Sequence, residues 1–385
     1  MHRLITTSEG VVELCEKLKD QPYITVDTEF IRERTYYSQL CLIQISAPCG
    51  VEAAIDPLAE GIDLTPFYAI LNDAPMRKVF HAAKQDLEIF YHLTGKIPHP
   101  IFDTQVAAMV CGYGEQVGYE ALVNKICKEK LDKSSRYSDW AQRPLSQKQL
   151  NYAISDVTHL RTIYETLDEK VKQAGRAHWI DEEMAILESP KTYEMDPEGA
   201  WKRIKLRKRD RINMQLLRAL AGWREQLAES KDKPRGRILR DEVLAQLAEI
   251  NPKSLEDMQQ ARGLNGRISN NQMAELFDVI DAARNEPEEN YPPLPKRPKN
   301  LKARQEVMLD ALKLLLKWEA ADNDVAPRLV AGKEDLTALV LGEEEDKIAC
   351  LHGWRREVYG QYALDFLAGK VNFHCENGRL VIKAD

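Results

Sequence analysis

One short run with strand character carries two acidic side chains. It reads Tyr-Ile-Thr-Val-Asp-Thr-Glu-Phe from residue 23, so β-branched and aromatic residues surround Asp27 and Glu29. Side chains alternate between the two faces of a strand, which puts both carboxylates on one face. The side chains expected on the other face, in a core, are Val26, Thr28 and Phe30. Two like charges on one strand are costly to bury unless a cation lies between them. The pattern therefore predicts either a solvated edge strand or a cation site.

The length of the chain bounds the number of domains. Its 385 residues exceed one ordinary hydrophobic core, so we expect two or three domains. Hydrophobic residues make up 44% and charged residues 30%, which is typical of a globular protein without a membrane partner. The N-terminus lacks a signal-peptide pattern, which predicts a cytoplasmic location. The seven cysteines are scattered without a Cys-x-x-Cys pair, which predicts neither a disulfide framework nor a zinc site.

The first 190 residues alternate between strand and helix patterns. Strands are predicted at about 23–30, 40–46, 51–55, 77–81 and 101–103. Helices are predicted at about 7–19, 63–71, 84–93, 106–110, 119–127 and 147–171. The short spacing after the first strand indicates an antiparallel meander. The expected fold is an α/β domain whose mixed sheet is flanked by helices.

Two more acids lie on predicted helices. Asp86 falls in a first helical turn just after a strand, and active sites of open sheets favour such edges. An acid there also stabilises a helix dipole without any further function. Tyr152 and Asp156 are four residues apart on one helix, so their side chains share a face. His81, at a strand end, fits a buried polar group as well as a ligand.

The acids and the tyrosine form one chemical set. Carboxylate oxygens suit Mg²⁺ or Mn²⁺, whereas zinc prefers nitrogen and sulfur ligands. Two such ions, about 4 Å apart, could hold the attacking and leaving oxygens of a phosphodiester, and a tyrosine could orient the attacking water. The candidate catalytic residues are Asp27, Glu29, Asp86, Tyr152 and Asp156.

The order and spacing of these residues resemble the DEDD superfamily of 3′→5′ exonucleases, in the subclass that carries a tyrosine in its third motif. The surrounding sequence is similar to the ribonuclease D family, in Asp27–Tyr37, Leu42–Gln44, Leu131–Ser134 and Asp139-Trp140. The resemblance covers about residues 1–190 and implies a ribonuclease H-like exonuclease fold.

The resemblance also implies roles. The four acids would bind two divalent cations, Mg²⁺ or Mn²⁺, and Tyr152 would orient the attacking water. The product would be a nucleoside 5′-monophosphate, and the substrates would be RNAs with a free 3′ end, such as tRNA precursors and other small structured RNAs. Phe30, Gln44 and His81 are candidates for contacts with the substrate. A DNA exonuclease and a non-catalytic RNA-binding scaffold remain as alternatives.

A basic region follows the first 190 residues. Residues 201–240 carry fourteen Lys or Arg against four Asp or Glu, a local net charge of +10 in a chain whose net charge is −7. Such a run is typical of a solvated helix face and also of a surface that follows a phosphate backbone. The candidates for backbone contacts are Lys205, Arg207, Lys208, Arg209 and Arg211. The helix there has an apolar stripe that predicts a core face, formed by Met214, Leu217, Leu220, Ala221 and Trp223.

The rest of the chain is expected to be helical. The block at 205–285 resembles the HRDC domain, a small helical module that binds nucleic acid. A proline-rich linker is predicted at 286–300, before a last helical block at 301–385. The expected architecture is an exonuclease domain at 1–190 followed by two all-α HRDC-like domains, in a monomer.

The last block looks like a degenerate, less basic repeat of the block before it. The residues that support this interpretation are Leu314, Leu315 and Trp318, which echo Leu216, Leu217 and Trp223.

Overall fold

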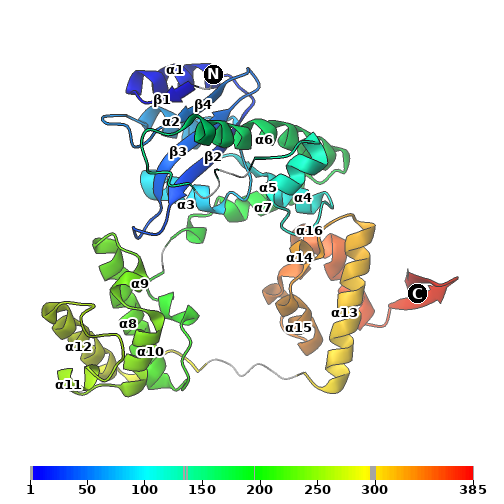
Figure 1. The fold of residues 1–385 in the computed structure, drawn as a ribbon. Helices are drawn as coiled ribbons and strands as arrows, with labels where there is room; N and C mark the ends of the chain where they lie inside the picture. The colour runs from blue at the N-terminus through cyan, green and yellow to red at the C-terminus, as the bar shows by residue number, and fades with distance from the viewer. Residues whose placement is uncertain (1–2, 133–134, 136–137, 195, 295–300, 385) are drawn as a thin grey trace. The chain divides into compact units, whose positions relative to one another are not determined.

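The computed structural model describes residues 3–132, 135, 138–194, 196–294 and 301–384 (Figure 1). Contacts divide the chain into two units, which are described separately. The first unit comprises Met1–Glu29, Leu42–Thr192 and Asn300–Asp385, and the second comprises Phe30–Cys41 and Tyr193–Lys299. Within the described ranges, no helix is long and apolar enough to cross a membrane. Lys133 and Ser134 of the motif text, and 295–300 of the predicted linker, lie outside the described residues.

A six-stranded sheet forms the centre of the first unit, in the order β1-β4-β3-β2-β5-β6. The strands are β1 Arg3–Ile5, β2 Tyr23–Ile31, β3 Gln39–Ser46, β4 Glu52–Ile55, β5 Arg77–Phe80 and β6 Ile101–Asp103. β3 and β4 are antiparallel, whereas β1 with β4, β2 with β5, and β5 with β6 are parallel. The mixed sheet is therefore confirmed. β1 was not predicted from the sequence.

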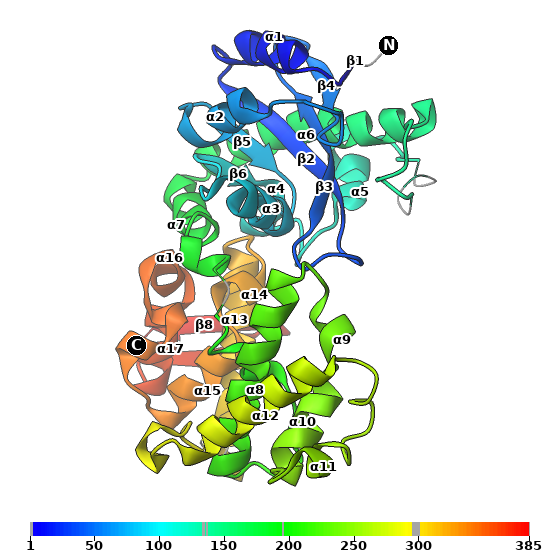
Figure 2. The same ribbon diagram turned by 90° about the vertical axis from the view of Figure 1, so that its left-hand side faces the viewer.

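Helices cover both faces of this sheet (Figures 1 and 2). α6 (Gln147–Gln173) lies on one face, where the Thr25 hydroxyl of β2 donates to the Val157 carbonyl at 2.8 Å. The two views place α2 (Thr65–Asp73) and α3 (Lys84–Thr94) on the other face. The further helices of this part are α1 Ser8–Leu18, α4 Thr104–Val110, α5 Tyr119–Leu122 with a π-helical turn at Val123–Cys127, and α7 Ala177–Leu187.

The C-terminal helices of the first unit pack against α7. The indole rings of Trp179 on α7 and Trp354 on α16 (Gly353–Arg355) stack with their centroids 4.5 Å apart. The Trp354 Nε1 donates to the buried Glu183 carboxylate at 3.1 Å, and Arg355 pairs with the same carboxylate at 2.6 Å. This contact combines aromatic stacking with a buried ion pair, and it ties the C-terminal region to the sheet domain.

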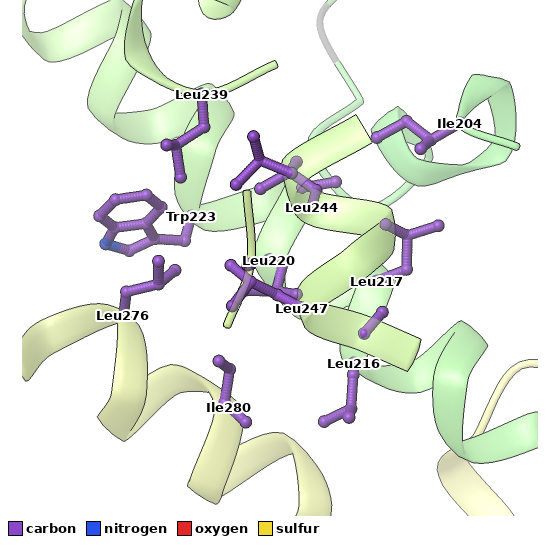
Figure 3. Packing of buried hydrophobic residues seen from close by; sticks show 14 of the residues in the cluster. Ile204, Leu216, Leu217, Leu220, Trp223, Leu239, Leu244, Leu247, Leu276 and Ile280 are labelled. Carbon is purple, nitrogen blue, oxygen red and sulfur yellow. The ribbon is translucent and has the colours of Figure 1, made fainter. Parts of the chain in front are cut away.

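The second unit is built around α8 (Arg211–Ser230), and its other helices are α9 Arg235–Ile238, α10 Asp241–Ile250, α11 Leu255–Met258 and α12 Asn270–Asn285. Leucines and isoleucines of α10 and α12 pack on the apolar stripe of α8 (Figure 3). All five stripe residues predicted from the sequence are buried. The core-face prediction is therefore confirmed.

The segment Phe30–Cys41 also belongs to the second unit. The Tyr36 hydroxyl donates to the Glu225 carboxylate of α8 at 2.7 Å, and the Tyr37 hydroxyl donates to Glu229 at 2.5 Å. Arg235 donates to the same Glu225 carboxylate at 2.7 Å. Because Glu225 is fully buried, these hydrogen bonds and ion pairs compensate its desolvation.

The described part of the predicted linker, 286–294, packs on α8. Arg211 donates to the carbonyls of Glu288 and Tyr291, and Gln215 donates to the Glu286 carboxylate at 2.8 Å. Tyr291 is buried. This stretch is thus part of the second unit.

The helix succession of the second unit recurs in the C-terminal region. α8, α9 and α10 have 20, 4 and 10 residues, and α13 (Ala303–Asp322), α14 (Pro327–Val330) and α15 (Lys333–Leu341) have 20, 4 and 9. The second copy starts 92 residues after the first, at Ala303 against Arg211. In this register the buried Leu309, Leu312 and Leu315 replace Leu217, Leu220 and Trp223.

The expected pairing of Trp318 with Trp223 is therefore wrong. That pairing matched one tryptophan with the other. The two regions instead correspond in the positions of their helices and of their buried residues. The two regions share an order and length of helices, and the repeat itself stays a prediction.

The chain also ends in an element that the sequence analysis did not predict. β7 (Val371–Glu376) and β8 (Arg379–Ala384) form an antiparallel hairpin. Asn377 and Gly378 connect them with φ angles of 52° and 76°, the backbone that a two-residue hairpin turn requires. The predicted helical character of the C-terminal region holds up to α17 (Gln361–Leu367).

A close approach at Gly112 provides a test of the packing within the first unit. Gly112 has φ +71°, and an added Cβ would lie 2.0 Å from Oδ1 and 2.8 Å from the carbonyl oxygen of Asp324. We expect Gly112→Ala to lower the free energy of unfolding by about 2–4 kcal/mol, since backbone strain and a steric clash add. Gly50→Ala is the matched control, because Gly50 has φ +84° and open space around it. Urea denaturation that gave equal losses for both variants would contradict the packing.

The buried Glu319 of α13 predicts a pH dependence of stability. Burial, with a smaller effect of the Asp322 charge, raises the pKa of Glu319 from 4.5 to about 7. The folded state then binds a proton that the unfolded state releases, so the stability contributed by this group is present below pH 4.5 and is lost as the pH rises through 7. We expect Glu319→Gln to raise the free energy of unfolding at pH 8 by roughly 1–3 kcal/mol, seen as a higher melting temperature, and to have little effect at pH 4. The exposed Glu306 on the same helix is the control; a pH-independent effect of Glu319→Gln would refute this account.

Candidate active site

Strand β2 presents two acids to helix α6. Thr25, Asp27 and Glu29 alternate onto one face, and the hydrogen bond from Thr25 to Val157 fixes that face against α6 one residue beyond Asp156. Oxygen atoms of Asp27, Glu29 and Asp156 lie within 4.8 Å of one another. Residues separated by more than 120 positions thus form one carboxylate cluster.

Asp86 approaches this cluster from α3. It lies in the first turn of the helix and is 6% exposed, and the Thr28 hydroxyl of β2 donates to its carboxylate. Thr28 lies on the face opposite Asp27 and Glu29, as predicted. Its hydroxyl nevertheless hydrogen-bonds the carboxylate of Asp86. Asp86 and Asp27 are close enough for the charge of each to affect the other.

The loop before α3 is held by another buried acid, Asp103. Its carboxylate accepts the backbone N–H groups of Ala82 at 3.0 Å and Ala83 at 2.8 Å, and it caps α4 through Gln105 at 2.8 Å. Ala82 has a φ of 57°, a conformation that is uncommon for an L residue. Asp103 therefore fixes the backbone of the loop that leads into α3, the helix that carries Asp86. The sequence analysis missed this role.

The electrostatics of the cluster require a positive partner. Burial raises the pKa of Glu29 to about 10, with further contributions from Asp27, Asp156 and Asp86 in that order. Burial raises the pKa of Asp27 to about 6 and that of Asp86 well above its usual range. Carboxylates arranged in this way either hold protons or share a cation. Their oxygen donors fit a hard divalent ion.

Helix α6 brings Tyr152 and Asp156 together. A capping box of Ser146 and Gln149 starts the helix. Burial, and then the Asp156 charge, raise the pKa of Tyr152 above its usual range, so the phenol keeps its proton at neutral pH. The buried ring of Trp140 lies 6.2 Å from that of Tyr152 and limits its motion. The predicted tyrosine–carboxylate pair is therefore adjacent to the cluster.

Tyr119, at the start of α5, is a site residue that the sequence analysis missed. Its hydroxyl donates to the main-chain carbonyl of Asp156, and its ring lies 5.5 Å from the His81 ring. Asp27, Tyr152 and Asp156 line a cavity of about 340 Å³ together with Tyr119 and His81. Such a cavity lies in the size range of small-ligand sites, roughly 300–1,000 Å³. The motif spacing gave no signal for Tyr119, because its contact joins residues 37 positions apart in the sequence.

His81 lines this cavity, and its Nε2 atom is buried. Its Nδ1 lies 3.0 Å from the Thr104 hydroxyl oxygen, and that hydroxyl donates its hydrogen to the Phe80 carbonyl at 3.0 Å. Nδ1 is therefore the donor, which leaves the lone pair on Nε2. Burial lowers the pKa of His81, so the neutral ring persists at neutral pH.

The other two candidates for substrate contacts, Gln44 and Phe30, do not line this cavity. Gln44 on β3 is fully buried, which argues against a direct contact with a nucleotide. Phe30 is partly buried and follows Glu29 by one residue, so its side chain points to the opposite face from the acids.

The basic residues of the second unit fall into two groups. Lys205, Arg207, Lys208 and Arg209 are exposed. Arg211 instead donates to the carbonyls of Glu288 and Tyr291, and its guanidinium lies 5.8 Å from the Tyr291 ring centroid. Arg211 therefore holds the 286–294 segment, and the first four residues remain as candidates for RNA contacts.

Known proteins share both the sequence and the fold. A family model described as 3′-5′ exonuclease matches residues 2–172, and the HRDC domain model matches residues 213–280. Ribonuclease D of Sphingobium indicum is 45% identical, over 99% of this chain and 98% of that protein. Ribonuclease D of Zymomonas mobilis is 44% identical, over 99% and 98%. This chain belongs to the ribonuclease D family.

The structure of a ribonuclease D agrees with this membership. The crystal structure of Escherichia coli RNase D, described as an exoribonuclease involved in structured RNA processing, aligns with a TM-score of 0.82 at 30% identity, covering 96% of this chain and 99% of that one. As a ribonuclease D, the chain is a 3′→5′ exoribonuclease of a family that uses divalent metal ions. The predicted activity and fold class are confirmed.

The hydrogen bond from Thr28 to Asp86 predicts a metal phenotype. We expect Thr28→Val to raise the divalent-metal concentration needed for half-maximal activity by about 10-fold, because partners behind metal-binding carboxylates tune their affinity. Thr25→Val on the same strand is the control, since the Thr25 hydroxyl donates only to main-chain carbonyls. That variant should lose about 1 kcal/mol of stability and keep its metal requirement. Metal titrations that shift equally in both variants would count against a role for Thr28.

Proposed function

We propose that the exonuclease site of this ribonuclease D is the cluster of Asp27, Glu29, Asp86 and Asp156, with Tyr152 beside it. The observation that carries the proposal is the convergence of oxygens of Asp27, Glu29 and Asp156 within 4.8 Å of one another. Asp27 and Asp156 line a cavity that Tyr152 also lines. The raised pKa values of the acids support a cation-binding role.

The acids divide into two overlapping metal-binding sets. Asp27, Glu29 and Asp156 would hold one divalent cation, and Asp27 with Asp86 would hold a second. Carboxylate oxygens favour Mg²⁺ or Mn²⁺ over softer metals. When bound, the cations would make the attacking water more acidic and would neutralise the leaving 3′ oxygen.

The residues of the chain itself position the reacting groups. Tyr152 stays protonated, so its hydroxyl can hold the attacking water by a hydrogen bond but is a poor base. Tyr119 fixes the main chain at Asp156. Attack of water on the terminal phosphorus forms a P–O bond and breaks the bond to the 3′ oxygen. The products are a nucleoside 5′-monophosphate and an RNA with a new 3′-hydroxyl.

The finer assignments follow from the family and the sequence. We propose small structured RNAs with free 3′ ends, tRNA precursors among them, as substrates. The Escherichia coli protein, described as acting in structured RNA processing, supports the structured-RNA part of this proposal. We further propose that the protein acts as a monomer in the cytoplasm, and that His81 contacts the terminal nucleotide.

Cleavage of end-labelled RNA tests the proposed residues. With 5′-labelled RNA that has a single-stranded 3′ tail, the wild type should give a one-nucleotide ladder with Mg²⁺ and none with a chelator. Asp156→Asn should reduce cleavage by at least about 10³-fold and keep RNA binding, because it removes a metal ligand without a change of volume. Asp168→Asn, on the same helix and outside the cluster, is the control.

The same assay separates the alternatives. An equal ladder on matching DNA would indicate a general nuclease, and tight binding without any ladder would indicate a scaffold. Full activity of Asp156→Asn would refute the assigned cluster.

A further inference from the structure

A short segment of the second unit has two chemically different sides. After the 3₁₀ turn Ala200–Arg203, Ile204 and Leu206 are buried, whereas Lys205 and Arg207 are exposed. This alternation is that of an extended chain on the surface of a core. The segment therefore presents cations outward while its apolar side chains reach the helices beneath.

An apolar cavity of about 350 Å³ opens on one side of the segment. Its inner wall consists of side chains of the hydrophobic core, namely Ile204, Leu206, Met214 and Leu217. Trp201 is partly buried against the same core and completes the wall with Pro293. An aromatic ring beside an apolar hollow of this size suits a flat, unsaturated ring.

Two cations stand at this cavity. Lys202 and Arg209 contribute to its lining and are exposed, and neither has an ion pair with any residue that the structure describes. The neighbouring Arg203, in contrast, pairs with Glu225 at 2.5 Å. Lys202 and Arg209 thus have charge available for a ligand.

The other exposed cations of the segment border a second cavity. This cavity, of about 570 Å³, is lined by Lys205, Arg207 and Arg262 and by the acids Glu242 and Glu249. Its Glu249 carboxylate is already engaged, since it accepts the backbone N–H of Arg207 at 2.7 Å. Cations of the segment therefore border both cavities.

We propose that the apolar cavity receives an unpaired nucleobase of the RNA, stacked on Trp201, while Lys202 and Arg209 bind the flanking phosphates. This inference rests on the proposed RNA substrate and adds a second RNA site to it. The rim charges favour a nucleic acid over an apolar protein side chain, because a neutral occupant would leave both cations without a partner. Stacking accepts every base, so the site holds single-stranded RNA without sequence preference.

Binding to base-deleted RNA tests the proposal. The protein is the full chain with Asp156→Asn, in buffer with a chelator. It is titrated with two single-stranded RNAs that have the same 3′-terminal nucleotides. One has normal bases upstream of them, and the other is abasic there. The abasic strand has the same charge, so we expect it to bind about 10-fold more weakly, the effect of losing one stacked base. Adding Trp201→Leu should weaken the normal strand by the same factor and leave the abasic strand unchanged.

Controls distinguish the cavity from its surroundings. Trp318→Leu changes another partly exposed tryptophan, on α13 in the first unit, and should bind like the parent. Lys202→Ala with Arg209→Ala should weaken both strands and reduce the salt dependence of Kd, since two phosphate contacts are lost.

Either of two results would overturn the base pocket. One is equal binding of normal and abasic RNA by the Asp156→Asn protein with Trp201 intact. This comparison does not depend on whether the Trp201→Leu variant folds. The other is unchanged binding by a folded Trp201→Leu protein. Both readouts are independent of cleavage, so failure of the pocket is distinct from failure of the catalytic assignment, which appears as a missing ladder.

Discussion

Repulsion among buried carboxylates is the constraint that the first unit resolves. Glu29 lies in the fields of Asp27, Asp156 and Asp86, and burial strengthens each of these interactions. A flexible chain would move these acids apart. The main-chain anchor of Thr25 on α6, the Thr28 hydroxyl on Asp86 and the Asp103 clamp before α3 hold them together. Packing therefore compensates the repulsion among the acids, and a divalent ion bound at the proposed site would relieve it further.

Local patterns predicted the elements that carry the site. Two acids at alternate positions of an apolar strand, an acid at a helix start and a Tyr-x-x-x-Asp pair are features that strand and helix geometry fix without any knowledge of the fold. The predicted strands and helices around Asp27, Asp86 and Asp156 are accordingly present. That the acids meet in space came from the resemblance, because spacing alone does not determine which faces pack together.

The missed features depend on contacts between distant residues. Tyr119 donates to the main-chain carbonyl of Asp156, 37 positions further along the chain, and Asp103 acts on the backbone of a loop that precedes it by about twenty positions. The C-terminal hairpin is different, since Asn377-Gly378 between alternating residues is a local turn signal. The prediction of a helical block for residues 301–385 left no place for a hairpin there. The misaligned repeat has a similar origin, since tryptophans are more conspicuous than buried leucines.

The membership of Phe30–Cys41 in the second unit bears on how such a chain can evolve. Residues 193–299 look like a cassette that recombination could delete or exchange. A deletion, however, would leave Tyr36 and Tyr37 without the glutamates of α8 that accept their hydroxyl hydrogens. Those tyrosines lie shortly after β2, the strand that carries Asp27 and Glu29. The exonuclease domain and the HRDC domain therefore share one inherited segment, and a viable exchange of either would have to carry that loop with its matching helix.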